Sequence, residues 1–192
     1  KNDNNRKQKR YAAALKKPIL KRTVFLEAYL GENVTGNSLA LFEEMYYDPR
    51  FKDYNFVWSV SSLKNIDPKY KQKKNVKYVK RGSKKYIKFL ACSEYLITDT
   101  TFPFYFNKRK DQKYIMAWHG TPYKAIGKDI VHAAKNAHNN VMKNILHTDF
   151  FISPSRFTTD TILKSQNSDE LFSGEVLEIG MPRVDLSYKD RK

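Results

Sequence analysis

The sequence predicts an α/β fold in which a mostly parallel sheet carries helices on both of its faces. Two observations lead to this fold class. Seven short apolar runs recur along the 192 residues, and stretches with helical spacing and helix caps lie between most of them. Strands that alternate with helices form βαβ units, whose right-handed crossovers place successive strands parallel in one sheet.

Each apolar run has the length and composition of a buried strand. The expected strands cover residues 23–30, 54–60, 76–79, 95–98, 114–118, 149–152 and 176–179. The expected helices follow a glycine, a proline or a capping residue and cover 38–47, 83–92, 129–146 and 155–164. This order of elements is Rossmann-like.

Length and composition favour one domain with its own core. A chain of 192 residues with 41% hydrophobic and 14% aromatic residues can bury one substantial core. We expect a lobe over residues 23–188, preceded by a basic lead-in or linker over 1–22 that is either flexible or helical. A single cysteine, Cys92, permits no internal disulfide. No apolar run approaches the roughly 20 residues of a membrane-spanning helix, so we expect a soluble or peripheral protein.

A formal net charge of +16 is concentrated in two clusters. Residues 6–22 hold eight Lys or Arg and no acid, and residues 64–88 hold eleven against the single Asp67. Such clusters attract nucleic acid, anionic lipid headgroups or a polyphosphate chain, and a solvated surface is the simplest alternative. Nucleic acid is not an expected partner, because no helix-turn-helix, zinc-finger or RRM string is present.

The apolar run 114–118 ends at a histidine. His119 is followed by Gly120, which permits a sharp turn, and by Thr121 and Pro122, which have the order of an N-cap and a first helical residue. We therefore expect His119 to face a helix N-terminus at the carboxyl edge of the sheet, where an anionic ligand such as phosphate is favoured.

Three loops are expected to meet at this edge, because they follow three strands of one parallel sheet. An imidazole can accept a proton at neutral pH, and a guanidinium can hold phosphate oxygens through paired donors. In the alternative interpretation, His119 only ends a strand and Asp185 pairs with Arg183 to fix a turn. The polar residues that these loops contribute are His119, Ser153, Ser155, Arg156, Arg183 and Asp185.

Neither a metal site nor a hydrolase nucleophile is expected. His132, His138 and His147 are six and nine residues apart, which does not set two of them on one helical face as a ligand pair. Ser153 and Ser155 lack the flanking glycines of a nucleophile elbow. We expect no cofactor.

A set of short motifs surrounds His119. The string WHGTP at 118–122 is followed by Lys124 and by Gly-Lys-Asp at 127–129, and FISPSR at 151–156 and GMPRVD at 180–185 lie downstream. Upstream, FLEA at 25–28 and YLIT at 95–98 fit the same pattern. Together these strings resemble the CDP-glycerol glycerophosphotransferase family, whose members prime and polymerise teichoic acids. The WHGTP string is far more specific than a lone glycine motif.

The resemblance implies one lobe of a GT-B architecture, the acceptor side. In such an enzyme, glycerol phosphate or ribitol phosphate moves from a CDP-activated donor such as CDP-glycerol to a lipid-linked polyol-phosphate acceptor. His119 would be the general base, Gly120, Thr121 and Pro122 would shape a phosphate-holding turn, and Lys124 and Arg183 would add positive charge.

The resemblance also implies where such an enzyme works and what surrounds this lobe. The nucleotide donor would be held mainly by a second lobe, to which residues 189–192 begin the connection. We therefore expect the chain alone to be an incomplete, inactive catalyst. Such an enzyme would be peripheral and would bind the anionic surface on the cytoplasmic face of the membrane. The alternative function is a non-catalytic basic module that binds anionic membranes or polyanions.

Overall fold

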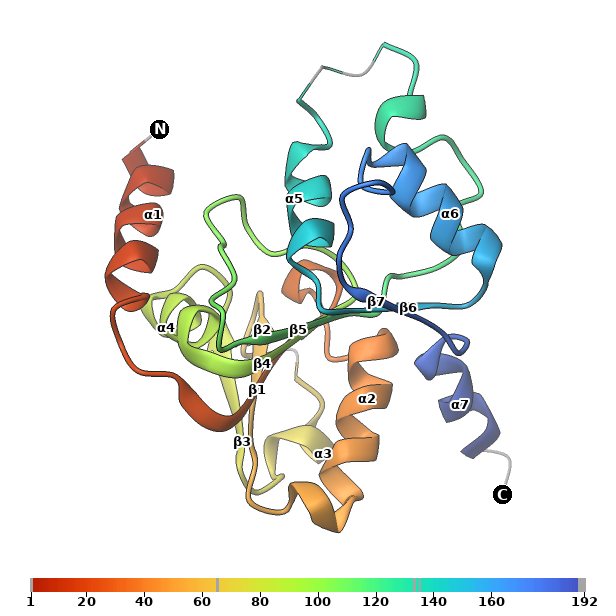
Figure 1. Cartoon of the computed structure of the whole chain (residues 1–192). Coiled ribbons are helices and arrows are strands. Elements are labelled where there is room, and N and C mark those ends of the chain that lie inside the picture. Colours follow the sequence, from red (N-terminus) through yellow and green to blue (C-terminus); the bar gives the residue numbers. More distant parts are fainter. Residues whose placement is uncertain (1, 65, 133, 135, 190–192) are drawn as a thin grey trace.

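A seven-stranded parallel sheet forms the centre of the computed structural model, which describes residues 2–64, 66–132, 134 and 136–189 (Figure 1). The strand order is β3-β2-β1-β4-β5-β6-β7, and each neighbouring pair is parallel. The predicted fold class is therefore confirmed, and each expected strand is present within a few residues. The strands are β1 (Leu20–Glu27), β2 (Asn55–Val60), β3 (Val76–Lys80), β4 (Ser93–Thr98), β5 (Lys113–Met116), β6 (Phe150–Ser153) and β7 (Glu175–Glu178).

Helices cover both faces of the sheet because alternate residues of the central strands point to opposite sides. Phe25 of β1 belongs to a hydrophobic cluster that includes residues of α1, α4, α5 and α6, whereas Val24 and Leu26 belong to a second cluster with residues of α2 and α3. Figure 1 shows the two layers of helices with the sheet between them. The helices are α1 (Asn2–Ala14), α2 (Gly36–Tyr47), α3 (Pro68–Lys71), α4 (Lys84–Cys92), α5 (Asn139–His147), α6 (Arg156–Ser165) and α7 (Pro182–Lys189).

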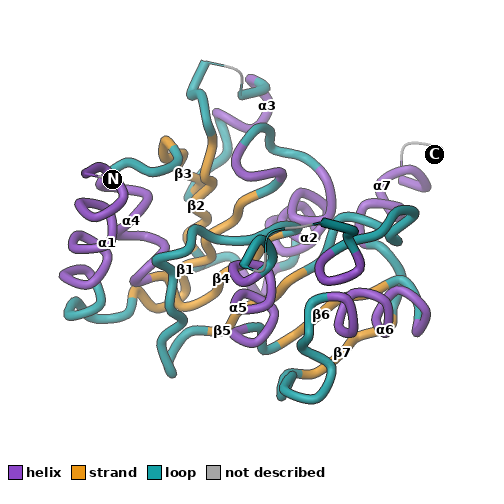
Figure 2. The backbone as a smooth tube through the Cα atoms, turned by 90° about the horizontal axis from the view of Figure 1, so that it is seen from above, coloured by secondary structure: helices purple, strands orange, loops and turns teal. Residues whose placement is uncertain are grey.

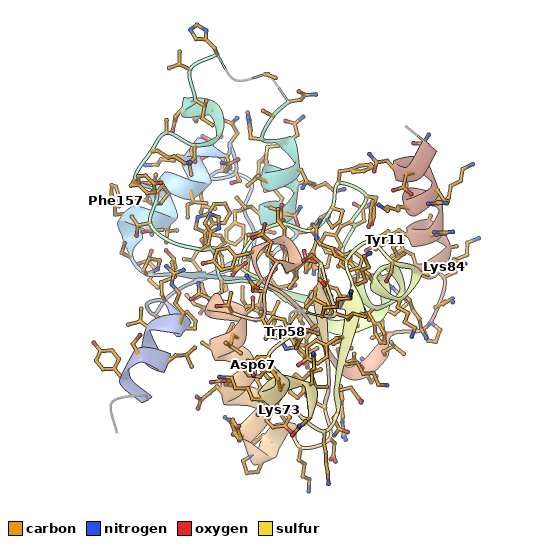
Figure 3. The ribbon with its side chains drawn as sticks, turned by 180° about the vertical axis from the view of Figure 1, so that it is seen from behind. Tyr11, Trp58, Asp67, Lys73, Lys84 and Phe157 are labelled. Carbon is orange, nitrogen blue, oxygen red and sulfur yellow. The ribbon has the colours of Figure 1, made fainter. Side chains whose placement is uncertain are left out.

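The basic lead-in is helical rather than flexible over Asn2–Ala14, the span of α1. This helix packs against α4, and both Figures 1 and 2 show the two helices side by side. Tyr11 anchors α1, because its ring is 2% exposed and its hydroxyl donates to the carbonyl oxygen of Asn107 at 2.8 Å (Figure 3). Of the expected connecting segment 189–192, residues 190–192 lie outside the described residues.

The prediction of one helix over 129–146 is wrong in its first half. Residues 127–129 form a short 3-10 helix, and α5 begins only at Asn139. The described residues between 130 and 137 are exposed, so they bury no apolar face, and most helix stability in proteins comes from such packing. His132 also adopts a left-handed φ of 63°, which an α-helix of L-residues excludes.

No helix among the described residues is both long and apolar enough to span a bilayer.

Gly127, in the segment after β5, lies directly against the end of α6. Its φ is +57°, and a Cβ atom added there would overlap the backbone carbonyl of Ser165. Both the left-handed φ and the contact therefore require glycine, which gives a physical reason for the Gly-Lys-Asp string at 127–129.

Gly127→Ala should destabilise the fold by more than about 3 kcal/mol, because a backbone shift adds to the strain of the left-handed φ. Gly180→Ala is the matched control: its φ is +90°, but a Cβ atom would meet nothing within 4 Å. The control should cost only about 1–2 kcal/mol. Denaturant unfolding of the two variants gives the comparison, and equal losses would contradict the steric explanation.

Candidate functional site

The candidate site lies at the carboxyl edge of the sheet, where the strand order reverses between β1 and β4. Loops that leave neighbouring strands in opposite directions open a crevice at such a point, and ligands of open α/β sheets bind there. Tyr29 follows β1 and Asp99 follows β4, and the Tyr29 backbone N–H donates to Asp99 Oδ1 at 2.9 Å. His119 follows the next strand, β5.

The His119 ring is held in one orientation while its side chain stays exposed. Its Nδ1 lies 2.9 Å from the backbone carbonyl oxygen of Asp99, and the ring stacks on Trp118 with centroids 4.5 Å apart. Because a carbonyl oxygen only accepts, Nδ1 must carry the proton of this hydrogen bond. The neutral imidazole then keeps its lone pair on Nε2, and the exposed side chain can present that atom to a ligand.

Arg183, at the start of α7, lies against the same turn. Its Nη1 donates to the carbonyl oxygen of His119 at 3.0 Å and to the Tyr29 hydroxyl at 3.2 Å. Gly120 has a φ of +151°, and a Cβ atom there would lie 3.7 Å from Arg183 Nη2. The predicted meeting of the loops after β5 and β7 is therefore confirmed, and it places a guanidinium beside the histidine.

Asp99 contributes a buried carboxyl group to this cluster. Its side chain is 1% exposed, and burial raises its pKa, while the Tyr29 N–H and the neighbouring His119 and Arg183 side chains act in the opposite direction. Gly36 passes directly beside it with a φ of +69°, and a Cβ atom there would lie 2.9 Å from Asp99 Oδ2. Glycine is therefore required where α2 begins.

The turn after His119 is joined to the start of α6 through hydroxyl groups. Thr121 Oγ1 lies 2.9 Å from Thr158 Oγ1, and Ser155 caps α6 by accepting from the Thr158 backbone N–H. The buried Ser153 donates to the carbonyl oxygen of Ser155 at 3.0 Å. In this structure both serines therefore hold the loop after β6.

The expected helix N-terminus at Thr121 and Pro122 is absent. Residues 121–126 are irregular, and four of the first five are exposed. An N-cap and a proline alone do not start a helix that has no apolar stripe to bury. The helix starts that lie next to the turn belong to α6 and α7.

Three of the predicted site residues lie outside these contacts. Lys124 is exposed, with its Nζ 6.0 Å from the centroid of the Tyr123 ring. Arg156 pairs with Asp160 of its own helix at 3.0 Å. In the described part of the chain, no ion pair joins Asp185 to Arg183, contrary to the interpretation in which this pair fixes a turn.

The residues that the sequence analysis missed are Tyr29, Asn37 and Asp99. Asp99 directly follows the run 95–98, so the strand-end reasoning that selected His119 applies to it equally. Tyr29 and Asn37 carry no comparable signal, because their contacts depend on which loops the strand order brings together.

The chain matches a family model described as CDP-Glycerol:Poly(glycerophosphate) glycerophosphotransferase over residues 9–192. It is 26% identical over 181 residues to the teichoic acid poly(glycerol phosphate) polymerase of Bacillus spizizenii, covering 91% of this chain and 44% of that protein. It is 28% identical over 176 residues to the teichoic acid glycerol-phosphate transferase of Staphylococcus aureus, covering 88% of this chain and 43% of that protein.

The fold agrees with these sequence matches. A solved structure of a variant of the wall teichoic acid polymerase TagF superposes with a TM-score of 0.79 at 25% identity, covering 96% of this chain and 46% of that one. The chain thus spans less than half the length of these relatives. It belongs to the CDP-glycerol:poly(glycerophosphate) glycerophosphotransferase family.

Proposed function

We propose that this chain is the acceptor-side lobe of a GT-B-type transferase that moves glycerol phosphate from CDP-glycerol to a lipid-linked teichoic acid acceptor. The observation that carries the proposal is the exposed His119 imidazole, whose Nδ1 is bound to the Asp99 carbonyl and whose Nε2 has no hydrogen-bond partner among the described residues. The family membership of the chain supports the same reaction class.

In the proposed reaction, Nε2 of His119 accepts the proton of an acceptor hydroxyl as its oxygen attacks the phosphorus of the glycerol phosphate unit. A new phosphate ester forms, the bond from that phosphorus to CMP breaks, and CMP leaves with the electron pair. Phosphoryl transfer requires mainly positioning and charge stabilisation from a protein. One base and a few cations are therefore sufficient.

Arg183 is the cation best placed to stabilise the transferred phosphate, because one of its nitrogens already contacts the His119 turn. The guanidinium has five N–H donors, so others remain for phosphate oxygens. Lys124, on the same loop, adds positive charge, and Gly120, Thr121 and Pro122 shape the turn. We place most of the nucleotide contacts on a second lobe, so this chain alone is not a complete catalyst.

His119→Ala in the full-length protein should lower the rate of glycerol phosphate transfer by about 100-fold or more, because general-base loss typically costs that much. A transfer assay with CDP-glycerol and a lipid-linked acceptor measures the effect. His147→Ala is the matched control, since His147 ends α5 at the opposite edge of the sheet. A variant that keeps more than about a tenth of the wild-type rate would contradict the base role, whereas a wild-type protein that shows no transfer would favour the non-catalytic module.

We further propose that the enzyme sits on the cytoplasmic face of the membrane and binds anionic lipid through the end of the molecule formed by α1 and α4. The packing of these helices joins parts of both basic clusters. A groove of about 210 Å³ runs between them, and Lys84 lies at this end in Figure 3. The cations that line the groove are Arg10, Lys17, Lys84 and Lys88.

Neutralising these four groove cations to glutamine should weaken sedimentation of the full-length protein with anionic liposomes. Wild-type binding should also weaken with added salt, because exposed charges are screened beyond about 10 Å at 0.1 M. Zwitterionic liposomes should bind neither protein. The control variant loses the same number of charges elsewhere on the surface. In it, glutamine replaces four exposed lysines, Lys52, Lys110, Lys128 and Lys164. An equal loss in both variants would contradict the assignment of the groove and leave only net charge as the cause.

A further inference from the structure

We infer that Asn37 is the positioning residue that locks the His119 turn to the Arg183 helix. The inference rests on the proposed function, because it assigns Asn37 a role in aligning the two groups that would act on the acceptor and the phosphate. Asn37 itself is 0% exposed and is therefore shielded from any substrate.

The Asn37 side chain bonds to two segments that are far apart in sequence. Its Nδ2 donates to the carbonyl oxygens of Ala117 at 2.7 Å and Trp118 at 2.6 Å, the two residues that precede His119. Its Oδ1 accepts from the backbone N–H of Arg183 at 3.1 Å. One amide group therefore fixes the backbone on both sides of the candidate site.

The carboxamide matches these three backbone groups in number and polarity. Two carbonyl oxygens need donors and one N–H needs an acceptor, and the asparagine side chain supplies two N–H donors and one oxygen. An aspartate of the same shape would place a carboxylate against two carbonyl oxygens, and an alanine would leave all three backbone groups without this partner.

The surrounding fold leaves this amide little freedom. Asn37 is in the first turn of α2, directly after Gly36 with its left-handed φ. Its helix packs against α7, as the contacts and Figure 1 show. A shift of the His119 turn relative to α7 would therefore have to break the bonds of Asn37.

The direct contact between Arg183 and His119 depends on the same alignment. Arg183 Nη1 reaches the His119 carbonyl at 3.0 Å only while α7 and the turn keep their separation. Misplacement of reacting groups by about 1 Å can lower a rate about 100-fold. Loss of Asn37 should thus affect the chemical step more than the binding of substrate.

Asn37→Ala in the full-length enzyme tests the inference. We expect kcat for glycerol phosphate transfer to fall about 10- to 100-fold while KM for CDP-glycerol changes by less than about threefold. The pH–rate profile of Asn37→Ala should keep the part that depends on the His119 base, because the base is displaced and not lost. In His119→Ala that part of the profile should be absent. In the double variant with Arg183→Ala, the two losses should be less than additive.

Asn144→Ala provides the matched control. Asn144 is also a buried asparagine, 1% exposed, whose amide bonds the backbone of Phe102 and Asn140 and accepts from the Tyr114 hydroxyl. These bonds do not involve the His119 turn or α7. Asn144→Ala should lose about as much thermal stability as Asn37→Ala. Below its melting temperature, it should keep the wild-type kcat.

Hydrogen exchange of the segment that follows β5 gives a readout independent of activity. Its amides should exchange faster in Asn37→Ala than in wild type or Asn144→Ala. Equal kcat in the two asparagine variants, or unchanged exchange of this segment, would overturn the inference. A wild-type enzyme that shows no transfer would instead overturn the proposed function, and the exchange result would still decide the structural part.

Discussion

The hydrogen bond between His119 Nδ1 and the carbonyl oxygen of Asp99 is the interaction on which the candidate site depends. It determines which ring nitrogen carries the proton, and so it leaves Nε2 as the one basic atom that faces outward. Stacking on Trp118 restricts the ring further. Without this bond the exposed ring would not be held in the tautomer that carries its proton on Nδ1.

The sheet creates the conditions for that bond. Placing β4 between β1 and β5 sets the loops after these three strands next to one another, and the strand ends are in register, with Glu27 and Met116 both opposite Thr98. The buried carboxyl of Asp99 receives the Tyr29 N–H from one side, while its carbonyl receives the imidazole from the other. Arg183 and Asn37 then fix α7 and α2 to the same turn. The site is thus built from loops but supported by buried bonds to regular elements.

Much of this fold could be predicted from the sequence because its strands are continuous apolar runs and several helices begin at clear caps, such as Ser83 and Ser155. The predictions were wrong where a segment had a helix-start sequence but no apolar face packed against the rest of the fold. Thr121 and Pro122 have the order of a helix start, yet no apolar stripe follows them. The meeting of His119 and Arg183 was predictable, since parallel strands share one carboxyl edge. The contacts of Tyr29 and Asn37 were not, because they depend on the strand order, which the sequence pattern does not specify.

The tautomer of His119 tests the central claim most directly. Nitrogen-15 chemical shifts and long-range proton couplings of the imidazole distinguish the two neutral forms, and a His119→Gln sample assigns the signal. The account predicts a protonated Nδ1 and an unprotonated Nε2. A ring that carries its proton on Nε2 would contradict it, because Nδ1 could not then donate to Asp99 and no basic nitrogen would face the acceptor.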